Sequence, residues 1–148
     1  MTTPSSAGAK PIVLAYSGGL DTSFLVPWLQ ENYQRPIITV TVDTGGIDAA
    51  AAALLRERAL ALGAVEHHQV DARADYFEQV LRFLVMGNVR RGQLYPLCVG
   101  AERVMQAQTI AHMARKLGTQ SIAHGCTATS RAAASKPRRC RVRSCAAG

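Results

Sequence analysis

A short apolar strand, a glycine turn and a helix are predicted in succession near the start of this sequence. Residues 12–16, IVLAY, form an apolar run that ends at Ser17-Gly18-Gly19. Asp21 and Thr22 then open a helical pattern. Its expected apolar face consists of Phe24, Leu25, Trp28 and Leu29. A continuous apolar run of this length is typical of a strand buried on both faces, so a strand–turn–helix unit of a parallel sheet is predicted.

The alternation of strands and helices continues along the chain. Apolar and β-branched runs predict further strands at 37–42, 65–70 and 121–124. Helical patterns predict helices at 49–62, 75–86 and about 100–117. Asp48 is expected to cap the second helix and Gly63 to end it. Trp28 and Phe77 are expected in the core. These patterns predict a Rossmann-like, doubly wound parallel α/β sheet of about four strands, with helices on both faces and the C-terminal part of the domain missing.

The positive charge of the chain is concentrated at its C-terminal end. The formal net charge is +7, but residues 1–128 hold 11 basic and 10 acidic residues, whereas residues 129–148 hold six basic residues and no acidic one. We expect a flexible lead-in at 1–10, an α/β domain at 11–128, and a basic, low-complexity, disordered tail at 129–148. Because the domain itself is nearly neutral, its charge does not indicate nucleic-acid binding.

The apolar runs and the cysteines favour a cytoplasmic protein. No run approaches the ~18 residues of a membrane span, and the N-terminus lacks the pattern of a signal peptide. The cysteines match no zinc-binding spacing, so reduced thiols are expected at Cys98, Cys126, Cys140 and Cys145.

The turn at Ser17-Gly18-Gly19 is the main candidate for a binding site. Nucleotides tend to bind at the first strand-to-helix turn of a parallel sheet, because the helix N-terminus offers free N–H groups and partial positive charge. The glycines allow close approach, and hydroxyls at Ser17, Thr22 and Ser23 add donors. The sequence contains neither a Walker A motif nor G-x-G-x-x-G. Pyrophosphate is the expected anion, with Asp21 as a candidate ligand of Mg²⁺.

The stretch AYSGGLDTS at 15–23 carries a family resemblance. Its SGGLDTS core is similar to the pyrophosphate-binding loop of the ATP-pyrophosphatase superfamily. Together with Tyr95 and His124-Gly125-Cys126-Thr127, the longer stretch resembles the argininosuccinate synthase family over about residues 10–128. The resemblance implies a ligase that joins citrulline and aspartate in arginine biosynthesis, using ATP and Mg²⁺ and passing through a citrullyl-adenylate.

The resemblance also implies roles for individual residues. Tyr95 would bind citrulline, Thr127 would bind aspartate, and Asp21 would hold the metal. The expected ATP-binding residues are Ala15, Tyr16, Ser17, Gly18, Gly19, Leu20, Asp21, Thr22, Ser23, Val42 and Gly125. No side chain is expected to act as a catalytic acid or base. The full-length form is expected to be a homo-oligomer.

This sequence departs from the family pattern in two places. Gly100 stands where the family commonly has a serine that contacts citrulline, and Ala128-Thr129-Ser130-Arg131 stands where it has a Gly-Asn-Asp loop that contacts both amino acids. Family members are also far longer. We therefore expect residues 129–148 to be a frameshift product that forms no element with a core face. The strand at 121–124 would then be an exposed edge, and the chain alone would show little or no synthetase turnover.

Two other functions remain open from the sequence alone. The first is another adenylating enzyme of the same superfamily, such as a tRNA sulfur-transfer enzyme. The second is a non-enzymatic nucleotide- or RNA-binding module that uses the arginine-rich segment 129–148 as an arm. Citrulline-dependent rather than tRNA-dependent release of pyrophosphate would separate the enzymes. RNA binding that is lost on deletion of 129–148 would identify the module.

Overall fold

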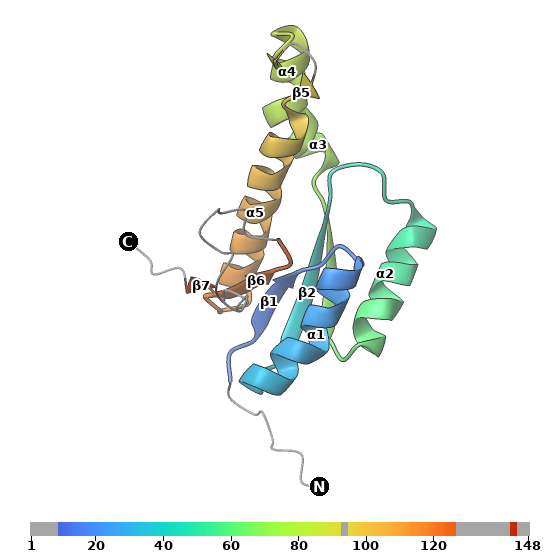
Figure 1. Ribbon diagram of the computed structural model, residues 1–148, viewed down its shortest axis with the longest axis vertical. Coiled ribbons are helices and arrows are strands. Elements are labelled where there is room, and N and C mark those ends of the chain that lie inside the picture. The colour runs from blue at the N-terminus through green and yellow to red at the C-terminus, as the bar shows by residue number, and fades with distance from the viewer. Residues whose placement is uncertain (1–8, 93–94, 127–142, 145–148) are drawn as a thin grey trace, which may run out of the picture.

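A parallel β-sheet forms the centre of the computed structural model, which describes residues 9–92, 95–126 and 143–144 (Figure 1). The parallel strands lie in the order β3-β2-β1-β6. They are β1 (Ile12–Ala15), β2 (Ile37–Asp43), β3 (Glu66–Asp71) and β6 (Ser121–His124). β1 pairs with β2 on one side and with β6 on the other. All four strands lie within one residue of the bounds predicted from the sequence.

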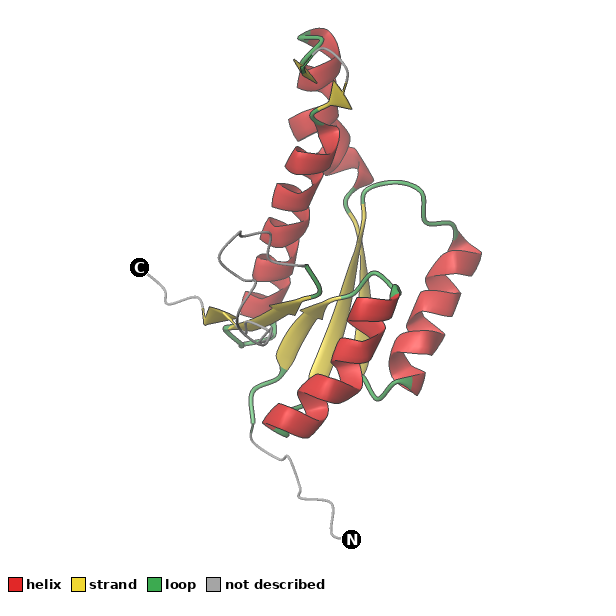
Figure 2. Ribbon diagram, in the orientation of Figure 1, coloured by secondary structure: helices red, strands yellow, loops and turns green. Residues whose placement is uncertain are grey.

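Helices cover both faces of this sheet (Figure 2). α1 (Leu20–Tyr33) and α2 (Ala49–Ala61) pack on one face, and α5 (Cys98–Lys116) packs on the other. Side chains alternate along a strand, so Leu14 of β1 packs with α1 whereas Val13 packs with α5. The doubly wound architecture predicted from the sequence is therefore confirmed.

The central strands are apolar because both of their faces are buried. Every residue of β2 is buried, including two threonines. Their hydroxyls donate to backbone carbonyls, from Thr39 Oγ1 to Glu66 O at 3.1 Å and from Thr41 Oγ1 to Tyr16 O at 2.7 Å. Burial of these polar groups is therefore compensated by hydrogen bonds.

Asp48 caps the N-terminus of α2, as predicted. Its Oδ1 accepts a hydrogen bond from Ala51 N at 2.7 Å. We expect Asp48→Ala to lower the free energy of unfolding by about 1 kcal/mol, the usual value of such a cap. Asp48→Asn should retain most of the stability, because asparagine caps helices equally well. Chemical denaturation measures both changes, and equal losses in the two variants would contradict a capping role.

The helix predicted at 75–86 is a longer helical segment with a π-helical turn in its middle. It consists of α3 (Arg73–Tyr76), η1 (Phe77–Leu81) and α4 (Arg82–Met86). The wider turn changes which side chains face the sheet. Val80 and Leu81 pack on the α5-side core, but Phe77 is 52% exposed. The prediction that Phe77 lies in the core is therefore wrong.

The buried face of α1 also differs from the expected one. Leu25, Val26 and Leu29 are buried, and Trp28 packs partly buried against the same core. Phe24 is 61% exposed. Because successive residues turn by about 100° around a helix, burying Val26 with Leu25 rotates Phe24 toward solvent.

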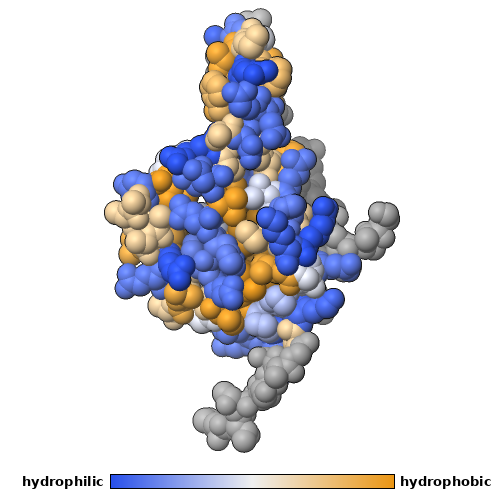
Figure 3. All heavy atoms as spheres, turned by 180° about the vertical axis from the view of Figure 1, so that it is seen from behind, coloured by the Kyte–Doolittle hydropathy of each residue, from blue (hydrophilic) through white to orange (hydrophobic). Residues whose placement is uncertain are grey.

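An apolar arm extends beyond the sheet, formed by α4 and the N-terminal end of α5 (Figure 1). Phe83, Val85 and Met86 are exposed there, and Figure 3 shows apolar side chains on this end from behind. The predicted loop at 87–99 contains an antiparallel hairpin of β4 (Arg90–Arg91) and β5 (Tyr95–Pro96). Among the helices of the described residues, none is both long and apolar enough to cross a membrane.

A fifth strand corrects the expectation for the edge of the sheet. β7 (Arg143–Ser144) pairs antiparallel with β6, placing Arg143 opposite Ile122 and Ser144 opposite Ser121. The expectation that β6 is an exposed edge is therefore wrong over these two residues, because backbone groups of β7 pair with them. The remainder of the predicted tail at 129–148 lies outside the described residues.

Candidate functional site

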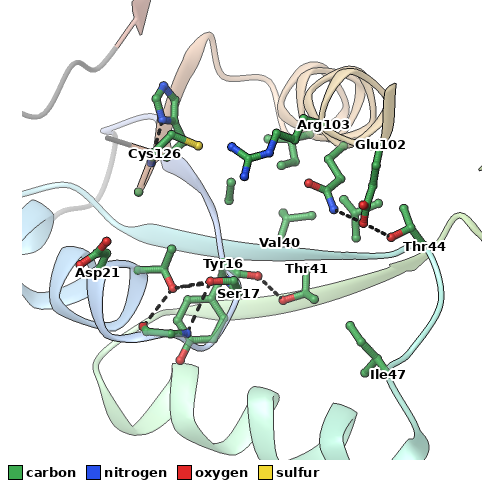
Figure 4. Close-up of a pocket in the computed structure, with 18 of the residues that line it drawn as sticks. Tyr16, Ser17, Asp21, Val40, Thr41, Thr44, Ile47, Glu102, Arg103 and Cys126 are labelled. Atoms are coloured by element: carbon green, nitrogen blue, oxygen red, sulfur yellow. Dashed lines mark hydrogen bonds between the residues drawn. The ribbon is translucent and has the colours of Figure 1, made fainter. Parts of the chain in front are cut away.

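The carboxyl ends of β1 and β6 open onto a pocket of about 840 Å³ (Figure 4). β1 leads into α1 on one face of the sheet, whereas β6 is reached from α5 on the other face. Ligands of open α/β sheets bind in the crevice at such a switch point. The pocket wall comes from the turn after β1, the end of β2, α5 and the segment after β6.

The turn between β1 and α1 lines the pocket at the N-terminus of α1. Gly18 has a φ of +73°, in the left-handed region that favours glycine. A Cβ at this position would overlap Leu55 Cδ2, so the turn also packs closely on α2. Gly19 is the N-cap residue of α1 and provides no side-chain cap. The N–H groups of the first helical turn are therefore not capped by the residue that usually does so.

Thr22 fixes the shape of this turn. Its Oγ1 donates to the Gly19 carbonyl at 3.2 Å and lies 3.2 Å from Ser17 Oγ. Since a hydroxyl has a single proton, Ser17 donates in the second bond. The Ser17 N–H also points to Thr22 Oγ1, at 3.4 Å. Two hydroxyls that the sequence suggests as anion donors therefore hold the turn in shape.

Gly125 brings the segment after β6 against the first turn of α1. A Cβ on Gly125 would lie 2.9 Å from Thr22 Cγ2 and 3.5 Å from Asp21 Cβ, so a larger residue would force the two segments apart. Cys126 N donates to His124 Nδ1 at 3.2 Å, which holds the backbone of Cys126 close to the end of β6. The turns after β1 and β6 therefore form one continuous side of the pocket.

α5 forms the facing wall, which the sequence analysis missed. Glu102 Oε1 accepts from Thr44 Oγ1 at 2.5 Å and from Gln106 Nε2 at 3.2 Å, so this carboxylate is tied to the turn after β2. Arg103 makes no hydrogen bond or ion pair within the described part of the chain, and Figure 4 shows its guanidinium extending over the pocket. A cation thus faces the N-terminus of α1. The helical spacing of 99, 102, 103, 106 and 110 is the signal in the sequence that could have revealed this wall.

The structure gathers most of the predicted ATP-binding residues at this pocket. Those that line it are Ala15, Tyr16, Ser17, Gly19, Leu20, Asp21, Thr22, Val42 and Gly125. Gly18, in the turn, and Ser23, in the first turn of α1, do not line the pocket. Tyr95 lies in β5, at the N-terminal end of α5, and the pocket reaches along α5 as far as Val99 (Figure 1). Thr127 lies outside the described residues.

The predicted metal ligand fits only one kind of magnesium site. Asp21 has an exposed side chain at the N-terminus of α1 and lines the pocket. The described ranges hold no group of three or more His, Cys, Asp or Glu residues that could share a metal ion. Mg²⁺ is commonly held by one or two carboxylates together with substrate phosphates. The donor set therefore suits a metal that arrives with a phosphate ligand.

Two ionisable side chains near the helices, Tyr76 and Asp71, have shifted pKa values. Burial, with Glu102 as a further cause, raises the pKa of Tyr76, whose hydroxyl donates to Cys98 O at 2.9 Å. At the end of β3, hydrogen bonds from Arg73 lower the pKa of Asp71 to about 2. The Asp71–Arg73 pair is exposed, so it contributes little to stability. Neither group lines the pocket.

The doubly wound sheet with a pocket at its switch point defines a Rossmann-like α/β domain. An NAD⁺ synthetase from Burkholderia pseudomallei has a similar fold, with a TM-score of 0.55 and 21% identity, covering 82% of this chain and 55% of that chain. A family model described as the arginosuccinate synthase N-terminal HUP domain matches residues 11–132. The chain belongs to the argininosuccinate synthase family, as the sequence resemblance predicts.

Curated relatives agree with this assignment. The argininosuccinate synthase of Pyrobaculum aerophilum is 41% identical over 121 residues, which cover 81% of this chain and 30% of the relative. That of Xanthomonas axonopodis pv. citri is 44% identical over 124 residues, covering 83% and 29%. The chain thus spans about 30% of the length of these relatives. The family match favours the argininosuccinate synthase resemblance over the two other functions left open by the sequence. It extends slightly beyond residue 128, where the resemblance was expected to end.

Proposed function

We propose that this chain is the ATP-binding part of an argininosuccinate synthase, a ligase that joins citrulline to aspartate and converts ATP to AMP and pyrophosphate. Family membership supports the reaction. The observation that carries ATP binding is the N-terminus of α1, which lacks a side-chain cap and faces an open pocket at the switch point of the sheet.

The pyrophosphate end of ATP would lie against the turn after β1. There the first N–H groups of α1 and the positive end of its dipole favour negative charge. Gly19 and Gly125 keep side chains out of this space, and Arg103 adds a cation from the facing wall. The adenosine end would extend toward Val42 at the end of β2. The pocket then holds the triphosphate between backbone donors and a guanidinium.

Magnesium would bind with the phosphates of ATP. Asp21 supplies the carboxylate, and phosphate oxygens would supply further ligands, in keeping with the donor set on this side of the pocket. When bound, the ion neutralises negative charge on the phosphate groups. Asp21 also lies in the first turn of α1, where a carboxylate is favoured by the helix dipole.

The two amino acids would occupy the remaining parts of the pocket. Tyr95, the proposed contact of citrulline, precedes α5, from which Val99 already lines the pocket. Thr127, the proposed contact of aspartate, directly follows Cys126, another lining residue. Residues of this chain would then contribute by holding the reactants together and by stabilising charge, without a side chain acting as acid or base.

Mapping amide chemical shifts during a titration with Mg²⁺ and ATP tests the proposed binding mode. We expect saturable changes at residues 17–22, Val42, Arg103 and Gly125. The amide shifts of residues 82–89, at the α4 side of the apolar arm, should stay unchanged and serve as an internal control. Adding citrulline to the ATP complex should then shift residues 95–99, whereas tRNA should not. Saturable shifts that are confined to the arm would contradict the proposal.

A further inference from the structure

A buried histidine lies behind the proposed phosphate turn. His67, on β3, is only 6% exposed, and its ring meets that of Tyr16 edge to face, with 5.9 Å between the centroids. Tyr16 is the residue immediately before Ser17-Gly18-Gly19. The neighbouring His68 instead has an exposed partner, Glu66 Oε2 at 3.0 Å. His67 is therefore part of the packing under the turn.

The hydrogen bonds around His67 favour the tautomer with its proton on Nδ1. Thr39 Oγ1 lies 2.9 Å from His67 Nδ1 and donates its single proton to Glu66 O, at 3.1 Å. Thr39 can then only accept from the imidazole, so Nδ1 carries the proton. The other nitrogen, Nε2, is buried and has no hydrogen-bond partner in the part of the chain that the structure describes. His67 is thus a neutral ring with a buried, unpartnered lone pair.

Tyr16 transmits the position of this ring to the turn. Its backbone N–H donates to Val40 O at 2.9 Å, and its carbonyl accepts from Thr41 Oγ1 at 2.7 Å. Its phenol oxygen lies 3.4 Å from Ser23 Oγ, in the first turn of α1. Tyr16 therefore connects the start of the turn to the helix that follows it. A displacement of its ring would change both ends of the Ser17–Gly19 backbone.

We infer that neutral His67 is a positioning residue for ATP, which acts through the Tyr16 ring to hold the Ser17–Gly19 turn in its binding conformation. This inference rests on the proposed function of the turn. Protonation of Nε2 would place an N–H with no acceptor, and a positive charge, in a buried site. The phosphate turn would then lose its support under mildly acidic conditions.

The charges around His67 oppose its protonation. Burial lowers the pKa of His67 from 6.5, and positive charge from Arg56 on α2 and from His68 on the same strand lowers it further. Tyr16, directly after β1, and Thr39, on β2, also contact the ring, and neither adds a positive charge beside it. A folded-state pKa below the unfolded value means that the unfolded chain binds the proton more readily. His67 therefore lowers the stability of the fold as the pH falls below 6.5, and has no such effect above it.

The test compares ATP dissociation constants of the 148-residue chain at about pH 7.5 and about pH 5.5. The variants are His67→Phe, which keeps a ring but cannot titrate, and His67→Gln, which keeps a donor toward Thr39. His68→Phe is the matched control at the neighbouring position. Thermal melts at both pH values give the folded fraction, to which each constant is referred. Protonation of ATP itself affects all four proteins alike.

We expect His67→Phe to bind ATP within about twofold of the wild type at the higher pH, because an aromatic contact to Tyr16 remains. At the lower pH the wild type and His68→Phe should both weaken by at least about threefold relative to His67→Phe and His67→Gln. An unchanged pH dependence in both His67 variants would overturn this inference alone. A folded wild type that binds no ATP at either pH would overturn the proposed function with it.

Discussion

Replacing Gly18 by alanine is expected to lower both the stability of the fold and its affinity for ATP. The φ of +73° costs an L-residue roughly 1–2 kcal/mol, and Leu55 must rotate away from the new Cβ. If the backbone relaxes instead, the N–H groups of the turn move away from the pocket. We therefore expect at least about a tenfold loss in ATP affinity, which corresponds to about 1.4 kcal/mol. Chemical denaturation and calorimetric titration measure the two effects.

Gly100→Ala is the matched control, because it makes the same glycine-to-alanine change at a position without a left-handed backbone. Gly100 lies within α5, has no positive φ, and a Cβ there would meet nothing within 4 Å. Gly100→Ala should therefore raise the free energy of unfolding by roughly 0.5–1 kcal/mol, because glycine is unfavourable inside a helix. A Gly18→Ala variant as stable as Gly100→Ala would contradict the role assigned to the left-handed turn.

Arg103→Ala should produce the second large effect, on ATP affinity and not on folding. The guanidinium is exposed and makes no ion pair or hydrogen bond within the described residues, so its removal leaves no internal partner behind. A charge-assisted hydrogen bond to a phosphate contributes about 1.5–3 kcal/mol, which predicts a loss of at least about tenfold in ATP affinity. Arg103→Lys should recover only part of it, since lysine lacks the bidentate fork.

Arg82→Ala is the matched control for the change in charge. Arg82 pairs with Glu78 at 2.7 Å on the exposed helical segment, away from the pocket wall. Such surface pairs contribute about 0–1 kcal/mol. We expect ATP affinity in this variant to remain within about twofold of the wild type, since long-range charge effects are screened by salt. Equal losses in the Arg82 and Arg103 variants would mean that Arg103 acts only through net charge.

The strands, the helix cap and the glycine turn could be predicted because the sequence patterns that specify them are local. Residues 12–14 of the apolar run are fully buried, and Asp48 caps α2 through a bond to a residue three positions away. The glycine turn could also be placed, because Gly18 adopts a conformation that few other residues tolerate. These features depend on neighbours in sequence, so periodicity and capping rules apply to them.

The facing wall of the pocket depends on tertiary packing. The helical spacing of 99, 102, 103, 106 and 110 marks one side of α5, but it does not say what that side faces. Arg103 and Glu102 reach the site because α5 crosses the sheet beside the end of β2, where Thr44 meets Glu102. Phe77 was misplaced because a π-helical turn interrupts the regular period. The burial of His67 likewise depends on tertiary contacts, with Tyr16 and through the packing of α2 over β3.

Calorimetric titration of the 148-residue chain with Mg²⁺ and ATP tests the central claim most directly, when it is repeated in the presence of excess pyrophosphate. Our account predicts saturable binding at a single site, weakened by pyrophosphate because both ligands require the N-terminus of α1. Circular dichroism under the same conditions verifies that the chain is folded. A folded chain that binds no ATP, or that binds ATP equally well with and without pyrophosphate, would contradict the account.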